Sequence, residues 1–323
     1  MKALASPASL KGVLTAVEAA SFLANGFRKS GVDVEELPIE DGGEGTLEVL
    51  ARALPGEWRS AKVSDPLGRP VDARWLLLDD GRAVIESAEA IGLGRVAEEE
   101  RDPLRASSRG LGELILAALD AEPRELLVCL GGTATVDGGA GLREVVDALP
   151  VPTTAACDVR NGLLGASGAA SAFGPQKGAS PDAVAELEAR LAGMEELADV
   201  ATVPGAGSAG GLGAAFAALG ATLVPGAELV LDAVRFRERL PAVDLVVTGE
   251  GIVDRWSDAH GGKSSGAVAA ACGEAGVPCV VFGGQVLHPI DGAELYELSG
   301  DTDLAAEDLV ELGRMLGRRL RGG

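Results

Sequence analysis

The sequence has 323 residues, and its 49 acidic against 28 basic side chains give a formal net charge of −21. Such an acidic surface repels nucleic-acid phosphate and anionic lipid, so we expect neither nucleic acid nor a membrane as partner and favour a small molecule in a local site. The 47% share of hydrophobic residues excludes general disorder, and the length suggests two domains or one large α/β unit.

Short apolar runs alternate along the chain with alanine-rich helical stretches, and glycine loops join them. This alternation is typical of α/β proteins with parallel strands, and five such units predict a doubly wound, flavodoxin-like parallel sheet. In chain order, the expected strands and following helices are Lys2–Ala5 with Thr15–Lys29, Val34–Leu37 with Gly45–Leu54, Leu126–Leu130 with Gly139–Leu149, Leu245–Val247 with Ser264–Ala275, and Cys279–Phe282 with Ala305–Leu320.

Two stretches interrupt this alternation. Residues Trp58–Leu93 read as short strands separated by DPLGRP and DDGR turns, and Val151–Pro241 mixes glycine-rich loops with one amphipathic helix at Pro181–Leu197. We interpret them as a second α/β domain inserted into the first. The predicted flavodoxin-like domain comprises residues 1–57, 108–150 and 241–323, and the inserted domain comprises residues 58–107 and 151–240.

Four cysteines without a CxxC pair, and only two histidines, argue against a disulfide framework or a zinc site. The first residues, MKALASPASLKG, lack the apolar stretch of a secretory signal. Every apolar run is interrupted well before the roughly 20 residues that span a bilayer. We therefore expect a cytoplasmic protein. A homodimer through an open sheet edge or the C-terminal helix is compatible with the sequence.

The first notable loop, EDGGEGT at residues 40–46, follows a predicted strand and precedes a helix. Gly42 and Gly43 permit backbone N–H groups to approach an anion there. Asp41 and Glu44 are suited to Mg²⁺ coordination or to proton abstraction from a hydroxyl. The same residues are equally consistent with a helix cap, with Glu44 favouring the helix dipole.

Further glycine loops follow later strands. GGTATVDGGAG at 131–141 offers the hydroxyls of Thr133 and Thr135, and TGEG at 248–251 follows another apolar run. Ligands of open α/β sheets bind outside the carboxyl ends of strands, so these loops predict one shared site. GAGSAG at 205–210 matches a dinucleotide fingerprint, but no convincing strand enters it, and we do not expect NAD binding.

The chain has six lysines against 22 arginines, and three of the lysines, Lys11, Lys177 and Lys263, stand next to glycine. A compact ammonium group at such positions is suited to phosphate oxygens. Together with the acidic loops, this distribution indicates phosphoryl transfer, in which positioning and charge neutralisation supply most of the catalysis.

Taken in order, these loops resemble those of the glycerate kinases of the bacterial class found in glyoxylate and glucarate catabolism. The resemblance implies ATP-dependent phosphorylation of D-glycerate to 2-phosphoglycerate with Mg²⁺, and two domains, one of them flavodoxin-like, with the active site in the cleft between them. The matching segments are SPASLKG (6–12), DGGEGT (41–46), DPLGRPV (65–71), GGTATVDGGAG (131–141), ACDVRNGLLG (156–165), FGPQKGA (173–179), PGAGSAGGLGA (204–214) and TGEG with Asp254 and GK (248–263).

The chain departs from the family pattern at three places. Ala8 replaces the aspartate of SPDSFKG, Val136 replaces the asparagine of GGSATNDGG, and the segment after Leu142 is shorter. These departures leave two alternatives open: a catalytically silent pseudo-kinase that binds glycerate or nucleotide, and a kinase for another small hydroxy acid.

The resemblance also suggests a role for each candidate residue. Lys11, Lys177 and Lys263 would neutralise phosphate charge or hold the glycerate carboxylate. Asp41, or else Asp254, would accept the hydroxyl proton. The candidate catalytic residues are Lys11, Asp41, Glu44 and Asp254, and the candidate Mg²⁺ ligands are Asp158 and Asp41, with Glu44 as a further choice. The candidate substrate- and nucleotide-binding residues are Ser6, Gly42, Gly43, Thr46, Gly132, Thr133, Thr135, Asp137, Lys177, Gly207, Gly210, Glu250 and Lys263.

Overall fold

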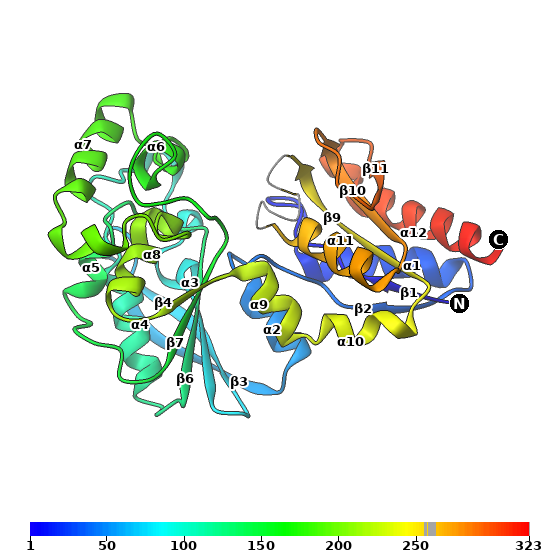
Figure 1. Ribbon diagram of the computed structural model, residues 1–323, viewed down its shortest axis with the longest axis horizontal. Helices are drawn as coiled ribbons and strands as arrows, with labels where there is room; N and C mark the ends of the chain where they lie inside the picture. The colour runs from blue at the N-terminus through cyan, green and yellow to red at the C-terminus, as the bar shows by residue number, and fades with distance from the viewer. Residues whose placement is uncertain (255–256, 258–262, 323) are drawn as a thin grey trace. The chain divides into compact units, whose positions relative to one another are not determined.

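Two separate β-sheets organise the chain in a computed structural model that describes residues 1–254, 257 and 263–322 (Figure 1). Each sheet belongs to its own compact unit. The first unit comprises Met1–Asp41, Glu48–Ala53 and Ala227–Gly323, and the second comprises Gly42–Leu47 and Leu54–Gly226. Among the described residues, no helix has the length and apolarity that crossing a membrane requires.

The first unit contains a five-stranded sheet in the order β11-β10-β9-β1-β2, and every pairing in it is parallel. Numbered along this unit, the order is 2-1-3-4-5, which is the flavodoxin order and confirms that prediction. Its strands are β1 (Lys2–Ala5), β2 (Asp33–Glu36), β9 (Leu245–Val253), β10 (Cys279–Val286) and β11 (Glu294–Glu297). Its helices are α1 (Ala16–Lys29), most of α2 (Thr46–Ala53) and of α9 (Gly226–Ala233), α10 (Phe236–Arg239), α11 (Ser264–Ala275) and α12 (Ala305–Gly322).

Helices α1 and α12 pack closely against each other beside this sheet (Figure 1). Helix α1 begins at a capping box in which Thr15 accepts from the Glu18 amide and Glu18 accepts from the Thr15 amide. A Cβ on Gly26 would lie 2.1 Å from the Val310 carbonyl oxygen of α12, so the close approach of the helices requires glycine. Leu23 and Phe27 of α1 enter the core of the unit together with side chains of α12 and the strands.

The second unit contains a six-stranded mixed sheet in the order β3-β4-β5-β6-β7-β8. β4 is antiparallel to β3 and β5, and the pairings from β5 to β8 are parallel. The strands are β3 (Gly56–Ser64), β4 (Pro70–Leu78), β5 (Arg82–Glu86), β6 (Glu125–Leu130), β7 (Thr153–Cys157) and β8 (Thr222–Pro225). The helices are α3 (Ser87–Ile91), α4 (Arg109–Leu119), α5 (Ala140–Arg143), α6 (Ala169–Phe173), α7 (Pro181–Ala192) and α8 (Ser208–Ala218).

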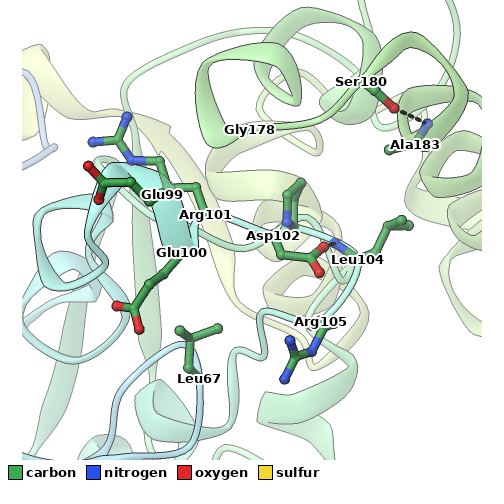
Figure 2. Close-up of a pocket in the computed structure, with 11 residues that line it drawn as sticks. Leu67, Glu99, Glu100, Arg101, Asp102, Leu104, Arg105, Gly178, Ser180 and Ala183 are labelled. Atoms are coloured by element: carbon green, nitrogen blue, oxygen red, sulfur yellow. Dashed lines mark hydrogen bonds between the residues drawn. The ribbon is translucent and has the colours of Figure 1, made fainter.

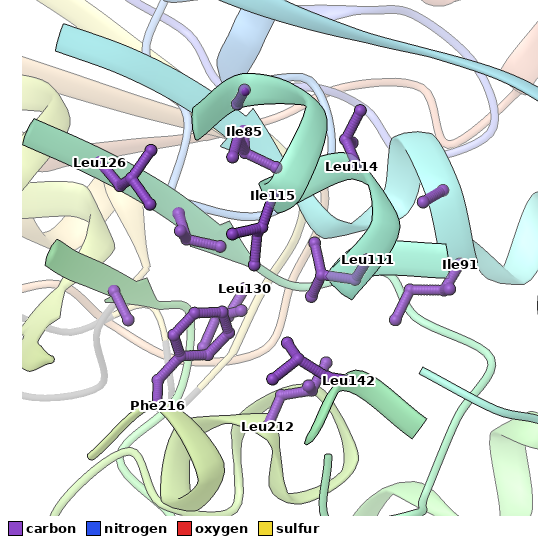
Figure 3. Packing of buried hydrophobic residues seen from close by; sticks show 14 of the residues in the cluster. Ile85, Ile91, Leu111, Leu114, Ile115, Leu126, Leu130, Leu142, Leu212 and Phe216 are labelled. Carbon is purple, nitrogen blue, oxygen red and sulfur yellow. The ribbon is translucent and has the colours of Figure 1, made fainter. Parts of the chain in front are cut away.

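The main core of the second unit lies between its central strands and the helices α4 and α8 (Figure 3). Leu111 and Ile115 of α4 lie in one cluster with Ile85 of β5 and Phe216 of α8 (Figure 3). All four side chains are fully buried. This packing fixes the carboxyl ends of the parallel strands, where the predicted loops begin.

Three details of the sequence-based prediction were wrong. Leu126–Leu130 is a strand, but as β6 it pairs with β5 and β7 in the second unit, so residues 108–150 do not belong to the flavodoxin-like unit. The fifth strand of that unit is instead β11. The helix expected at Gly139–Leu149 extends only over α5, Ala140–Arg143.

β9 also continues beyond its predicted end to Val253, so the TGEG segment lies within the strand. Its later residues pair with β10 alone, since β1 pairs only as far as Val247. The candidate residue Glu250 therefore stands on a strand that extends past the carboxyl end of its neighbour.

Candidate active site

In the first unit, the loop after β1 runs between two neighbouring strand ends. The Ser6 amide donates to the Val247 carbonyl of β9 over 2.8 Å, and the Ser6 hydroxyl donates to the Leu37 carbonyl after β2 over 2.6 Å. The order of the sheet reverses between β1 and β9, and ligands of open α/β sheets bind at that position. The loop that leads to the exposed Lys11 therefore lies where a ligand is expected.

Glu40 is a buried carboxylate that contacts this loop. Its side chain is 2% exposed, and its Oε1 accepts a hydrogen bond from the backbone amide of Ser9 over 3.0 Å. Burial and the adjacent Asp41 raise the pKa of Glu40 to about 8, whereas Ser9 and Lys11 act in the opposite direction. Glu40 was not among the predicted site residues, although an acidic residue directly after the apolar segment Leu37–Ile39 was an available signal.

A second charged group of the first unit surrounds Lys263. Its Nζ lies 3.0 Å from Oε2 of Glu250 and 3.2 Å from Oδ1 of Asp254. The hydroxyl of Ser265, which was not predicted, donates to the other carboxylate oxygen of Glu250 over 2.7 Å. The structure thus brings together three predicted residues, while residues 258–262 of the same family segment lie outside the described residues.

In the second unit, Glu86 fixes the glycine loop at residues 42–47. Its carboxylate stands at the end of β5 and accepts hydrogen bonds from the amides of Gly45 and Leu47, each over 3.1 Å. Burial raises the pKa of Glu86 to about 7, and the nearby charges of Glu44 and Glu89 add to the shift. Glu86 was also not among the predicted site residues, because a single acidic residue after an apolar run usually marks only the end of a strand.

The raised pKa of Glu86 has a measurable consequence for stability. Because the folded protein holds this proton between pH 4.5 and about 7 and the unfolded chain releases it, stability falls as pH rises through that window. We expect the wild type to lose stability relative to Glu86→Gln as pH rises. The unfolding free energy of the wild type minus that of Glu86→Gln should fall by up to about 3 kcal/mol from pH 4.5 to pH 7. Urea unfolding at several pH values measures it, and parallel curves for the two proteins would contradict the assignment.

The loop held by Glu86 approaches the ends of β6 and β7. A Cβ on Gly131 would lie 2.7 Å from Cα of Gly43 and 2.9 Å from Oδ2 of Asp158, so only glycine permits this approach. Asp158 follows β7, and the hydroxyl of Ser208 donates to its Oδ1 over 2.9 Å. The exposed Glu44 lies beside Gly132, because a Cβ there would be 3.2 Å from the Glu44 carboxylate.

Lys177 is buried beneath the GGTAT loop rather than exposed to a ligand. Its Nζ donates to the Thr133 hydroxyl over 3.1 Å and to the Thr135 carbonyl over 2.8 Å, and the residue is 4% exposed. Burial lowers the pKa of Lys177 to about 8, although the charges of Asp158 and Asp137 oppose that shift. The predicted direct contact with phosphate is thus replaced by contacts that hold the loop after β6.

Two orphaned hydroxyls stand at the same edge of this sheet. Within the described part of the chain, the buried Oγ1 atoms of Thr46 and Thr135 have no hydrogen-bond partner. A buried polar atom of this kind is costly unless it is paired. Both are predicted binding residues, and both side chains are fully buried.

The remaining predicted residues of this unit hold loops together. Asp137 accepts from the Ser108 amide and hydroxyl, each over 2.8 Å, and from the amides of Gly139 and Gly141. A Cβ on Gly207 would lie 2.2 Å from the Gly162 carbonyl oxygen. These residues therefore shape the site through its backbone.

Gly210 offers a direct test of this packing. It has φ +73°, and a Cβ on it would lie 1.9 Å from the Thr135 carbonyl oxygen, whereas Gly220 has φ +86° and nothing within 4 Å. We expect Gly210→Ala to lower the unfolding free energy by about 2–5 kcal/mol, and the matched Gly220→Ala by only about 1–2 kcal/mol. Urea unfolding measures both, and equal losses would contradict the close packing.

A cavity of about 570 Å³ lies elsewhere in the second unit (Figure 2). Residues 99–105 line one side of it, and Gly178, Ser180 and Ala183 line the other. Figure 2 shows the hydrogen bond by which Ser180 caps α7 through the Ala183 amide. None of the predicted site residues lines this cavity, although Gly178 directly follows Lys177.

The model of the glycerate kinase family matches residues 3–151 and 143–304, which together span most of the chain. The chain belongs to the glycerate kinase family. The matched ranges include both charged groups of the first unit and the loops of the second.

Named glycerate kinases match over similar lengths. The chain is 38% identical to a glycerate kinase of Halalkalibacterium halodurans, over 87% of this chain and 84% of that protein. It is 40% identical to the glycerate 2-kinase of Escherichia coli K12, over 80% of this chain and 78% of that protein. A solved structure from Salmonella typhimurium LT2, described as glycerate kinase 2, matches with a TM-score of 0.81 and 33% identity, covering 100% of this chain and 99% of the other.

The two substitutions in the glycerate kinase motifs have different surroundings. Val136 is 1% exposed and packs in an apolar cluster with Leu163 and Leu187. Its side chain therefore belongs to the core rather than to a ligand-binding surface. Ala8 is 7% exposed and lies in the loop after β1, next to the Ser9 amide that donates to Glu40.

The predicted Mg²⁺ ligands are the carboxylates of Asp158 and Asp41. Among the described residues, no group of three or more His, Cys, Asp or Glu side chains could hold a metal ion. Mg²⁺ in kinases commonly needs only one or two protein carboxylates together with substrate phosphates. Asp158, oriented by Ser208 beside Gly131, fits that requirement in the second unit, and Asp41 belongs to the first unit.

Proposed function

We propose that this chain transfers the γ-phosphoryl group of ATP to the C2 hydroxyl of D-glycerate, producing 2-phosphoglycerate and ADP. The observation that carries the proposal is that lysines and carboxylates of the glycerate kinase segments gather near the carboxyl ends of parallel strands. Family membership and the relative named glycerate 2-kinase support the substrate and the position of transfer.

The lysines of the first unit are assigned to the anionic groups of the substrates. Lys263 is oriented by Glu250 and Asp254, and Lys11 is exposed at the end of the loop after β1. A compact ammonium group neutralises phosphate oxygens or holds the glycerate carboxylate. In the transfer, the C2 oxygen bonds to the γ-phosphorus while the bond from that phosphorus to the bridging oxygen breaks, and ADP leaves with the electron pair.

The proton of the C2 hydroxyl requires an acceptor, for which we assign Asp41. Asp254 is the second choice; its Oδ1 lies 3.2 Å from the Lys263 ammonium. Glu44 is exposed in the glycine loop of the second unit and remains a candidate for contacts with the substrates.

When bound, Mg²⁺ would supply positive charge that offsets the negative charge of the phosphates during transfer. Asp158 is the ligand that we assign first, since Ser208 fixes one of its oxygens and the neighbouring Gly131 carries no side chain. The hydroxyls of Thr46 and Thr135 are assigned to binding of the substrates. Cytoplasmic location and a homodimer stay predictions.

The experiment that tests the function measures ADP release by the purified protein with Mg-ATP and a panel of small hydroxy acids. D-glycerate is expected to give the highest kcat/KM. Faster turnover of another hydroxy acid would identify a different kinase. No turnover, together with a rise in melting temperature on adding glycerate or ATP, would identify a pseudo-kinase.

A further inference from the structure

Residues 8 and 40 meet at one short stretch of backbone in the first unit. Ala8 occupies the position at which the pattern SPDSFKG carries an aspartate, and the next amide, that of Ser9, donates to the carboxylate of Glu40 over 3.0 Å. We propose that Glu40 supplies the carboxylate that the pattern places at position 8 and acts as a positioning residue for Lys11. The proposal rests on the proposed function in taking Lys11 as a substrate-binding cation.

The backbone explains how residue 40 reaches this position. The Leu37 amide donates to the Ala5 carbonyl over 2.8 Å, and the Ile39 amide donates to the Pro7 carbonyl over 3.0 Å. The chain after β2 therefore continues alongside the loop after β1, although neither segment remains part of a strand. This pairing brings the side chain of Glu40 against Ser9.

The loop is also held on its other side. The Ala8 amide donates to the Gly249 carbonyl of β9 over 2.9 Å. A Cβ on Gly251 would lie 3.8 Å from the backbone amide nitrogen of Lys11, so the loop and β9 remain close up to that residue. With the Glu40 carboxylate bound to Ser9, the backbone is fixed two residues before the Lys11 side chain.

The surroundings of Glu40 favour a functional over a stabilising role. Its side chain is 2% exposed, it accepts a hydrogen bond from the Ser9 amide, and the next residue, Asp41, is a second acid. Burying a carboxylate beside another acid is costly, so a neutral residue of similar size would make the protein no less stable. We explain this buried acidic side chain by the hydrogen bond with which it holds the Ser9 amide of the loop after β1.

The test uses Glu40→Ala, Glu40→Gln and the double variant Ala8→Asp/Glu40→Ala in the full chain. Asp33→Ala is the matched control, because Asp33 is an exposed carboxylate at the start of β2. Three quantities are measured: kcat and KM for D-glycerate and ATP, the melting temperature, and hydrogen exchange of the peptide covering residues 6–14.

We expect Glu40→Ala to lower kcat/KM by about 10-fold or more and to speed exchange in the peptide, because the hydrogen bond that holds the Ser9 amide is lost. Glu40→Gln keeps an oxygen that can accept from the Ser9 amide, so it should retain most of the wild-type kcat/KM without lowering the melting temperature. The double variant should regain most of the lost activity and protection, and Asp33→Ala should match the wild type.

Two results would overturn the proposal. In the first, Glu40→Ala has the same kcat/KM as Asp33→Ala and the same hydrogen-exchange rate in the peptide covering residues 6–14. The other is a double variant that melts cooperatively yet recovers neither quantity. If the wild type itself does not phosphorylate glycerate, the proposed function fails, and the exchange rates of the same variants still decide the role of Glu40.

Discussion

Lys263→Met is expected to lower kcat for glycerate phosphorylation by about 100- to 1000-fold, the range found when one electrostatic stabiliser of a transition state is removed. The Lys263 ammonium lies 3.0 Å from Glu250 and 3.2 Å from Asp254. Removing it takes away a cation and leaves two carboxylates that repel phosphate. Initial rates of ADP release at saturating Mg-ATP and D-glycerate measure the effect.

Two further variants show whether the charge of Lys263 is responsible. Lys29→Met removes an exposed lysine at the end of α1 in the same unit and is expected to keep the wild-type kcat. Lys263→Arg keeps the charge but replaces a compact ammonium with a planar group, so partial activity is expected. A Lys263→Met protein that retains more than about a tenth of the wild-type kcat would contradict the assigned role.

Lys177→Met is expected to lower kcat by about 100-fold, because small displacements of a positioned group have effects of that size. Lys177 holds Thr133 and Thr135 in the loop after β6, so its loss is expected to move that loop and to leave kcat more affected than KM. Lys62→Met is the matched control, since Lys62 is an exposed lysine of β3 in the same unit.

The pH dependence of Lys177 gives opposite signs for activity and stability. With the pKa of Lys177 lowered from 10.5 to about 8, the folded protein loses this proton before the unfolded chain does. Wild-type stability relative to Lys177→Met should therefore rise between pH 8 and 10.5, while activity that needs the ammonium falls above about pH 8. Activity that stays level to pH 10 would show that the charge has no catalytic part.

The sequence was informative about strands whose burial gives a continuous apolar pattern. β1, β9 and β10 were predicted near their observed starts, because parallel strands covered on both faces are apolar throughout. The same pattern does not say which sheet a strand joins, so β6 was assigned to the wrong unit. β11 was missed because it is a short strand of four residues, ELYE. Its two glutamates are exposed and its two central residues are only half-buried, so it gives no apolar run.

Lysines and acids in glycine-rich segments could be selected as candidates from the sequence, and the structure brings Lys263, Glu250 and Asp254 together. Contacts made through the backbone were not predictable from residue type. Glu40 and Glu86 accept hydrogen bonds from amides of distant loops, and only the folded chain shows which amides they reach. The burial of Lys177 against Thr133 was likewise not predictable from its place between two glycines, and its role in binding stays a prediction.

Phosphorus NMR of the product formed from D-glycerate and Mg-ATP shows directly which hydroxyl is phosphorylated. We expect the resonance of 2-phosphoglycerate, increasing in step with ADP and with the amount of enzyme. A resonance of 3-phosphoglycerate, or ADP and inorganic phosphate without a phosphorylated glycerate, would contradict it.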